Sequence, residues 1–207
     1  MRKLANKKIG HIWEYYKIHI LGTIGGILFT VFVVHSVMTN PDTAWSAFYL
    51  NSPMTDAESQ MLVEDFQKNY LSDENHQYIF DTNLAFSINQ PTQADHEQMA
   101  KFTALVAAKE LDFMIADRTT IEHYVSLGGF HDLDVFLSID EKEKWNEHLV
   151  YLEGADGIER VYGLDITDMI VPFQNESSHH KVIASIPINS ENEEITRQFI
   201  EYLYLNK

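Results

Sequence analysis

Hydrophobic and polar residues follow two alternating periods along the first two thirds of the chain. Three apolar, strand-like runs are separated by segments whose apolar residues recur at helical spacing. The strand-like runs are 44–50, 78–88 and 111–117, and the helical segments are 55–71, 92–110 and 119–128. This alternation predicts an α/β domain whose strands form a parallel sheet with helices on its faces.

Five predicted helices begin with a residue pair that suits a helix amino terminus. A serine or threonine is followed three residues later by an acidic residue, so both side chains can accept hydrogen bonds from backbone N–H groups. The pairs are Thr55 with Glu58, Thr92 with Asp95, Thr119 with Glu122, Ser138 with Glu141, and Ser190 with Glu193. The helix that starts near Thr119 is expected to end at Gly128-Gly129, where a left-handed residue suits glycine.

The alternation of strand-like and helical segments stops after residue 138. One helix is expected to run from Ser138 through Trp145 to Leu149, followed by short strands at 160–166 and 168–173 and a polar loop. The strand at 181–188 returns the chain to the sheet, and a last helix follows. We therefore interpret residues 139–180 as a small excursion from the sheet.

Residues 18–38, IHILGTIGGILFTVFVVHSVM, carry no formal charge at neutral pH. As a helix they would measure about 31 Å, close to the hydrocarbon thickness of a bilayer. The basic residues of this region all precede the segment, which favours a cytoplasmic tail over 1–17 and an extracellular part over 39–207. We predict a single-pass protein of the cell membrane, with the lipid bilayer as the surroundings of this helix.

Two other interpretations of this segment remain open. A cleaved signal peptide shares the basic start, although its apolar core would be shorter, and Val34 with Ser36 would form its cleavage pair. A buried helix of a soluble protein is the second, and the charge asymmetry around the segment disfavours it.

A stripe of small residues marks one face of the predicted membrane helix. Gly22 and Gly26 form a GxxxG pair, and Thr30 continues the stripe one turn later. Small residues let two helix backbones approach closely, so this face is a candidate for a homodimer or for a membrane-protein partner. The alternative is chance, because glycine is common in membrane helices.

Charge narrows the classes of function. The chain holds 15 basic and 31 acidic residues; five basic residues and one acidic residue lie before position 41, so residues 41–207 hold 10 and 30, a net charge of −20. Such a domain repels phosphate backbones, and no nucleic-acid partner is expected. The absence of cysteine excludes disulfides and thiolate ligands.

Sequence motifs for catalysis and metal binding are missing. The ten histidines are scattered without an HExxH pair, and no GxSxG, P-loop or GxGxxG motif occurs. We expect no enzymatic activity, no metal and no cofactor.

Three segments resemble the extracellular solute-binding proteins of bacterial ABC importers. They are ALVAAKELDFMIADRTTIEHYVSLGGFHDLDVFL at 104–137, VYGLDI at 161–166, and IASIPINSENEEITRQFIEYL at 183–203. The resemblance implies a fold like that of type II periplasmic binding proteins, in which ligand lies in a cleft between two lobes. This chain has room for one three-layer α/β lobe and a remnant of the other, so the resemblance implies a short, membrane-anchored and degenerate relative.

Ligands of open parallel sheets bind outside the carboxyl ends of the strands. Three stretches are candidates there: Asn51 and Ser52, the loop at 81–83, and Asp117, Arg118 and Thr119, where Arg118 would pair with an anion. Asp165 is a further candidate for the same cleft. In the alternative interpretation Thr119 caps the helix, Asp117 and Arg118 form a solvated pair, and Asp165 belongs to a turn.

Two functions follow. The first is a membrane-anchored, extracellular, non-enzymatic binding module that captures or senses a small solute or a peptide. The second is an interaction or accessory subunit of a membrane transporter or of a cell-envelope complex.

Overall fold

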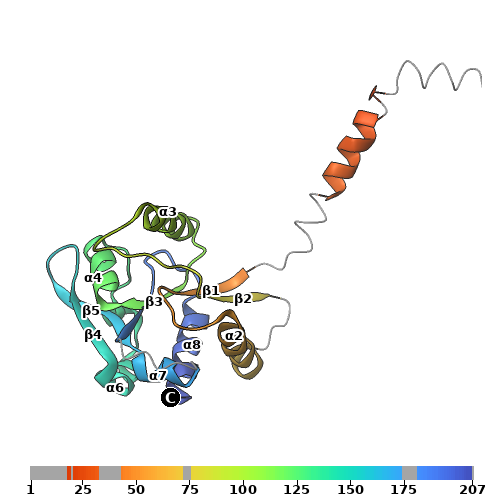
Figure 1. The fold of residues 1–207 in the computed structure, drawn as a ribbon. Coiled ribbons are helices and arrows are strands. Elements are labelled where there is room, and N and C mark those ends of the chain that lie inside the picture. Colours follow the sequence, from red (N-terminus) through yellow and green to blue (C-terminus); the bar gives the residue numbers. More distant parts are fainter. Residues whose placement is uncertain (1–17, 20, 33–42, 72–75, 174–180, 207) are drawn as a thin grey trace, which may run out of the picture. The chain divides into compact units, whose positions relative to one another are not determined.

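The computed structural model describes residues 18–19, 21–32, 43–71, 76–173 and 181–206 (Figure 1). The chain divides into one unit up to Asp42 and a second from Thr43 to Lys207. The predicted cytoplasmic tail, residues 33–38 of the predicted membrane segment and the polar loop at 174–180 lie outside the described residues.

The described part of the amino-terminal unit is a helix over residues 18–19 and 21–32 with every side chain exposed. Among the described residues, no helix has the length and apolar character that a membrane crossing requires. A Cβ added at Gly22 or Gly26 would meet no atom within 4 Å, and the Thr30 hydroxyl donates to the Gly26 carbonyl at 2.9 Å. The membrane span and the small-residue contact stay predictions.

The second unit is an α/β domain built on one six-stranded mixed sheet in the order β2-β1-β3-β6-β5-β4. The strands are β1 Thr43–Tyr49, β2 Gln77–Asp81, β3 Phe113–Asp117, β4 Leu149–Glu153, β5 Glu159–Asp165 and β6 Val182–Ser185. β1 pairs in parallel with β2 and β3, whereas the three pairings that involve β4, β5 and β6 are antiparallel. The α/β prediction is confirmed, and the all-parallel arrangement holds only for the first half.

Helices cover both faces of this sheet (Figure 1). They are α2 Asp56–Tyr70, α3 Gln93–Ala107, α4 Arg118–Ser126, α5 Leu133–Phe136, α6 Ile139–Lys144, α7 Thr167–Ile170 and α8 Glu193–Leu205. Side chains of a strand alternate between its faces, so Phe113 and Ile115 of β3 join a core with α2 and α8, while Met114 and Ala116 join a core with α3 and α4. The domain therefore has three layers.

Aromatic rings dominate the core under α2 and α8. Phe199 of α8 is fully buried and lies 4.8 Å from Trp45, 5.1 Å from Phe66 and 5.6 Å from Phe113, measured between ring centroids. The Trp45 indole N–H donates to the Thr196 hydroxyl at 2.9 Å. The last helix, α8, thus completes the core around β1 and β3, although these strands lie far from α8 in the sequence.

Three predicted capping boxes are confirmed, at Thr55, Thr92 and Ser138. Gly128 has a φ of +74°, which confirms the left-handed residue after α4. The other two helix starts were predicted wrongly. α4 is capped by Asp117 rather than Thr119, and α8 begins after Asn192, because the Ser190 hydroxyl donates instead to the buried Asp112 carboxylate at 2.9 Å.

The second half contains the other corrections. Residues 167–173 are helical rather than a strand, because Met169 and Ile170 bury a short apolar run whose length alone does not separate the two structures. The helix after Ser138 ends at Lys144, and residues 149–153 form β4. The excursion is thus part of the sheet, since β4 and β5 extend it beyond β6.

Candidate functional site

The sheet changes winding direction between β1 and β3. The helix after β1, α2, packs on one face, and the helix after β3, α4, packs on the other. At such a point the connections diverge and leave a crevice outside the carboxyl ends of the two strands, where α/β proteins commonly bind ligands.

A cavity of about 340 Å³ occupies this position. We call it the crevice. Its walls come from the segments that follow β1, β2 and β3, together with the first turn of α3. The lining residues are Asn51, Ala85, Phe86, Ser87, Ile88, Asn89, Asp95, Asp117, Thr119 and Thr120.

Asn51 joins two walls of the crevice. Its side-chain amide donates to the Phe86 carbonyl at 3.0 Å and accepts from the Phe86 N–H at 3.1 Å. Its backbone has a φ of +54°, a left-handed conformation that asparagine adopts more readily than most residues. The side chain therefore holds the loop after β1 against the segment after β2.

Asp117 and Thr119 lie on the opposite wall. The Asp117 carboxylate accepts from the Thr120 N–H at 3.1 Å and from the Thr120 hydroxyl at 2.9 Å, and so caps α4. Thr119 is exposed and lines the crevice. Its side chain can accept a ligand contact without loss of a cap.

Three predicted site residues lie outside the crevice lining. The Ser52 hydroxyl accepts from the Met54 N–H at 3.0 Å and shapes the turn after β1. Arg118 donates to Glu122 at 2.6 Å, one helical turn along α4, and lines a different groove. Arg118 is absent from the lining of the crevice, because residues 118 and 119 lie in different directions around the helix axis. Its role as an anion partner stays a prediction.

Asp165 ends β5 at the same edge of the sheet as Asp117, since β5 and β3 both pair antiparallel with β6. Its carboxylate accepts from the Thr167 N–H at 3.1 Å and the Thr167 hydroxyl at 2.6 Å, and Lys181 lies 3.5 Å away. Burial raises the pKa of this carboxyl, but these bonds and Lys181 outweigh it and lower the pKa overall. Asp165 belongs to a turn, as in the alternative interpretation.

Sequence reasoning missed the segment 85–89 and Asp95 as crevice walls. Asp95 was recognised only as the acidic partner in the Thr92 cap, yet it also accepts from the Ser87 N–H at 3.1 Å. The Thr92 hydroxyl, together with the backbone N–H groups of Thr92 and Ser87, holds the pKa of Asp95 below its usual value. The sequence contained one signal for this wall: the apolar run 78–88 is too long for one short strand, and β2 ends at Asp81.

The lining of the crevice is mixed, polar and apolar, and its charged groups are negative. Asp95 and Asp117 contribute two carboxylates, and none of the described residues that line it is basic. Polar neutral or positively charged groups suit such walls, and anions do not. Across the described ranges, no three His, Asp or Glu side chains gather as metal ligands.

Comparison with known proteins assigns no family. No protein-family model matches the chain, and no curated protein matches its sequence. An α/β domain with a six-stranded mixed sheet is what the structure shows; the solute-binding resemblance stays an expectation.

Proposed function

We propose that the chain is a non-enzymatic binding module that captures or senses a small polar solute or a peptide in the crevice. The observation that carries this proposal is the position of the crevice, outside the carboxyl ends of β1 and β3 where the winding of the sheet reverses. The resemblance to extracellular solute-binding proteins of ABC importers supports the same class of function.

The ligand class follows from the walls. Two carboxylates, with no basic residue among the described residues that line the crevice, favour a neutral polyol or a cationic amine over an anion. Thr119 and Ser87 are both exposed, and their side-chain hydroxyls can donate hydrogen bonds to such groups or accept them.

Membrane anchoring through residues 18–38 is part of this proposal. The described helix residues expose large apolar side chains over most of the helix surface, including Leu21, Ile24, Phe29 and Val31, and small residues occupy the remaining face. A helix with so much exposed apolar surface needs an apolar environment, and a bilayer supplies one. With the basic tail in the cytoplasm, the acidic domain lies outside the cell.

Protease added to intact cells should therefore degrade the domain and spare the tail, and a protected domain would overturn this orientation.

A thermal-unfolding screen of the full-length chain in a nonionic detergent tests ligand binding. Trp45 and Trp145 are buried in the domain and report its unfolding by fluorescence. A ligand at 100 times its Kd should stabilise the domain by about 2.7 kcal/mol. We expect hits among polyols or amines; hits confined to anions would contradict the assignment of the crevice.

An accessory role is the second candidate function, and a specific observation favours it. The side chains of Asn51, Asp95 and Asp117 already form hydrogen bonds within the domain, so these polar groups have partners without a ligand. In this case the protein acts as a partner of a membrane transporter or of a cell-envelope complex. The face with Gly22, Gly26 and Thr30 would contact the membrane-protein partner, or a second copy of the chain.

Replacing both glycines by leucine should then weaken association, and unchanged association would remove that contact from the proposal.

A further inference from the structure

Among the strands that the structure describes, β4 is at the edge of the sheet and its outer side has no partner. It is the last strand in the sheet order, next to β5, and the pairing found for it within the described residues is the one with β5 (Figure 1). In the part of the chain that the structure describes, the backbone of residues 150–153 forms no hydrogen bond beyond this pairing. Alternate N–H and C=O groups of an antiparallel edge strand point away from the sheet, so β4 offers a template for one more strand.

A groove of about 450 Å³ runs between β4 and α4. Arg118, Glu122 and Ser126 form its helical wall, and their spacing of four residues places them on one face of α4. The strand side is formed by residues 151–154 together with Glu159. An extended segment beside β4 would thus have a floor for its alternate side chains.

The charges of this groove are unbalanced. Glu153 and Glu159 are directly opposite each other on β4 and β5, an arrangement in which like charges repel. Within the described residues, neither carboxylate has a hydrogen bond or an ion pair. The nearby cation Arg118 is already paired with Glu122 at 2.6 Å.

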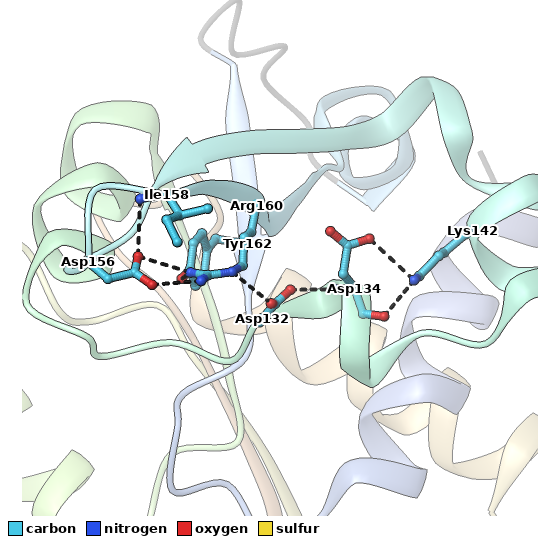
Figure 2. A network of polar contacts seen from close by, with 7 residues as sticks. All are labelled: Asp132, Asp134, Lys142, Asp156, Ile158, Arg160 and Tyr162. Carbon is cyan, nitrogen blue, oxygen red and sulfur yellow. Dashed lines mark hydrogen bonds and ion pairs between the residues drawn. The ribbon is translucent and has the colours of Figure 1, made fainter.

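Arg160, next to Glu159 in β5, is also committed elsewhere. Figure 2 shows its guanidinium between Asp156 and Asp132, with the Tyr162 hydroxyl beside it. It donates to Asp156 at 2.6 and 3.0 Å and lies 3.5 Å from Asp132. These contacts tie the β4–β5 turn to the start of α5, which holds the edge strand in position without a partner.

We propose that β4 and this groove bind an extended, basic segment of a partner protein by strand addition. Backbone hydrogen bonds to β4 supply the affinity, and a lysine or arginine side chain placed opposite Glu153 offsets the charge of the Glu153–Glu159 pair. The inference names a surface and a partner class for the accessory role. It is independent of the crevice, so either can fail without the other.

Fluorescence anisotropy on the full-length protein in nonionic detergent tests the proposal. The probe is a blocked five-residue peptide of alternating valine and lysine that begins and ends with valine, so that its length matches β4 and its central residue is uncharged. Two control peptides separate the contributions: glutamate in place of lysine reverses the charge, and a central proline keeps the charge but removes a backbone donor. We expect the proline and glutamate peptides each to bind at least about tenfold more weakly, given the usual contribution of one hydrogen bond and one charge pair. Equal binding of the proline peptide would show ionic adsorption only and would overturn strand addition.

The double variant Glu153→Gln with Glu159→Gln should weaken binding of the lysine peptide about tenfold. The matched control is Glu64→Gln with Glu143→Gln, which removes the same charge from exposed positions on α2 and α6. Equal losses in both pairs would overturn the site. Hydrogen exchange adds the position: the lysine peptide should slow exchange over residues 149–153, and protection elsewhere alone would refute β4 as the template.

Discussion

The two halves of the sheet use their strands differently. In the parallel half, β1, β2 and β3 all deliver their connecting segments to one edge, and those segments enclose the crevice. In the antiparallel half, β5 ends at the same edge, but its turn closes on itself through Asp165 and Thr167. The antiparallel half instead has β4 at the end of the described sheet, with the outer edge of this strand unpaired. Parallel pairing gathers loops into one site, whereas an antiparallel extension offers a backbone edge.

The largest expected effect tests whether the parallel half depends on the last helix. Phe199→Ala removes a fully buried ring that touches Trp45, Phe66 and Phe113, and should lower the free energy of unfolding by about 3–5 kcal/mol. Leu205→Ala, at an exposed position of the same helix, should change it by less than about 0.5 kcal/mol. Chemical denaturation measures both, and equal losses would mean that α8 does not close this core.

A second substitution tests the antiparallel half. A Cβ at Gly163 of β5 would collide with the Ile183 side chain of β6 and come within 3.1 Å of the Ala184 carbonyl oxygen. Gly163→Ala should therefore destabilise the domain by about 1–3 kcal/mol, as overpacking does. The control is Ile158→Ala, at an exposed position just before β5. A neutral Gly163→Ala in the same denaturation assay would be inconsistent with the β5–β6 pairing.

The halves also differ in how far the sequence predicts them. The parallel half was predicted well because each strand is followed by its own helix, and local signals such as the Thr55 and Thr92 caps mark the boundaries. The antiparallel half was not, because β6 pairs with β3 across more than 60 residues and local periodicity contains no pairing information. The same reason explains the site: Asn51, Asp117 and Thr119 follow from strand ends, whereas 85–89 and Asp95 depend on how a loop folds back.

Asn51 allows a finer test of the crevice. Asn51→Gly keeps the left-handed backbone but loses both bonds to Phe86, and should cost about 1–2 kcal/mol. Asn51→Ala loses the same bonds and adds backbone strain, so it should cost about 1 kcal/mol more. Denaturation curves of the two variants separate these contributions. Identical curves would show that the conformation at Asn51 is not strained for alanine.

The smallest effects concern acid titration in the two halves. Hydrogen bonds from Thr92 lower the pKa of Asp95 beside the crevice, and hydrogen bonds from Arg160 lower that of Asp156 in the β4–β5 turn. A carboxyl with a lowered folded-state pKa stabilises the fold above its unfolded pKa of about 3.9, and this stability is lost as the pH falls through the folded value. Thr92→Ala should raise the pKa of Asp95 alone, and Arg160→Gln that of Asp156 alone. Carboxyl carbon NMR titration measures both, and a joint shift would contradict independent causes.

The most direct test of the crevice compares tryptophan at two neighbouring positions. Thr119 lines the crevice and Arg118 lines the groove beside β4, so Thr119→Trp should fill the first and leave the second open, and Arg118→Trp the reverse. The measurement is the ligand-induced rise in unfolding temperature of the full-length chain, with a polyol or amine that stabilises the parent protein. We predict that the ligand no longer raises the unfolding temperature of Thr119→Trp, whereas it raises that of Arg118→Trp as much as that of the parent protein. A full rise in Thr119→Trp, or no stabilising ligand at all, would contradict the crevice as a binding site.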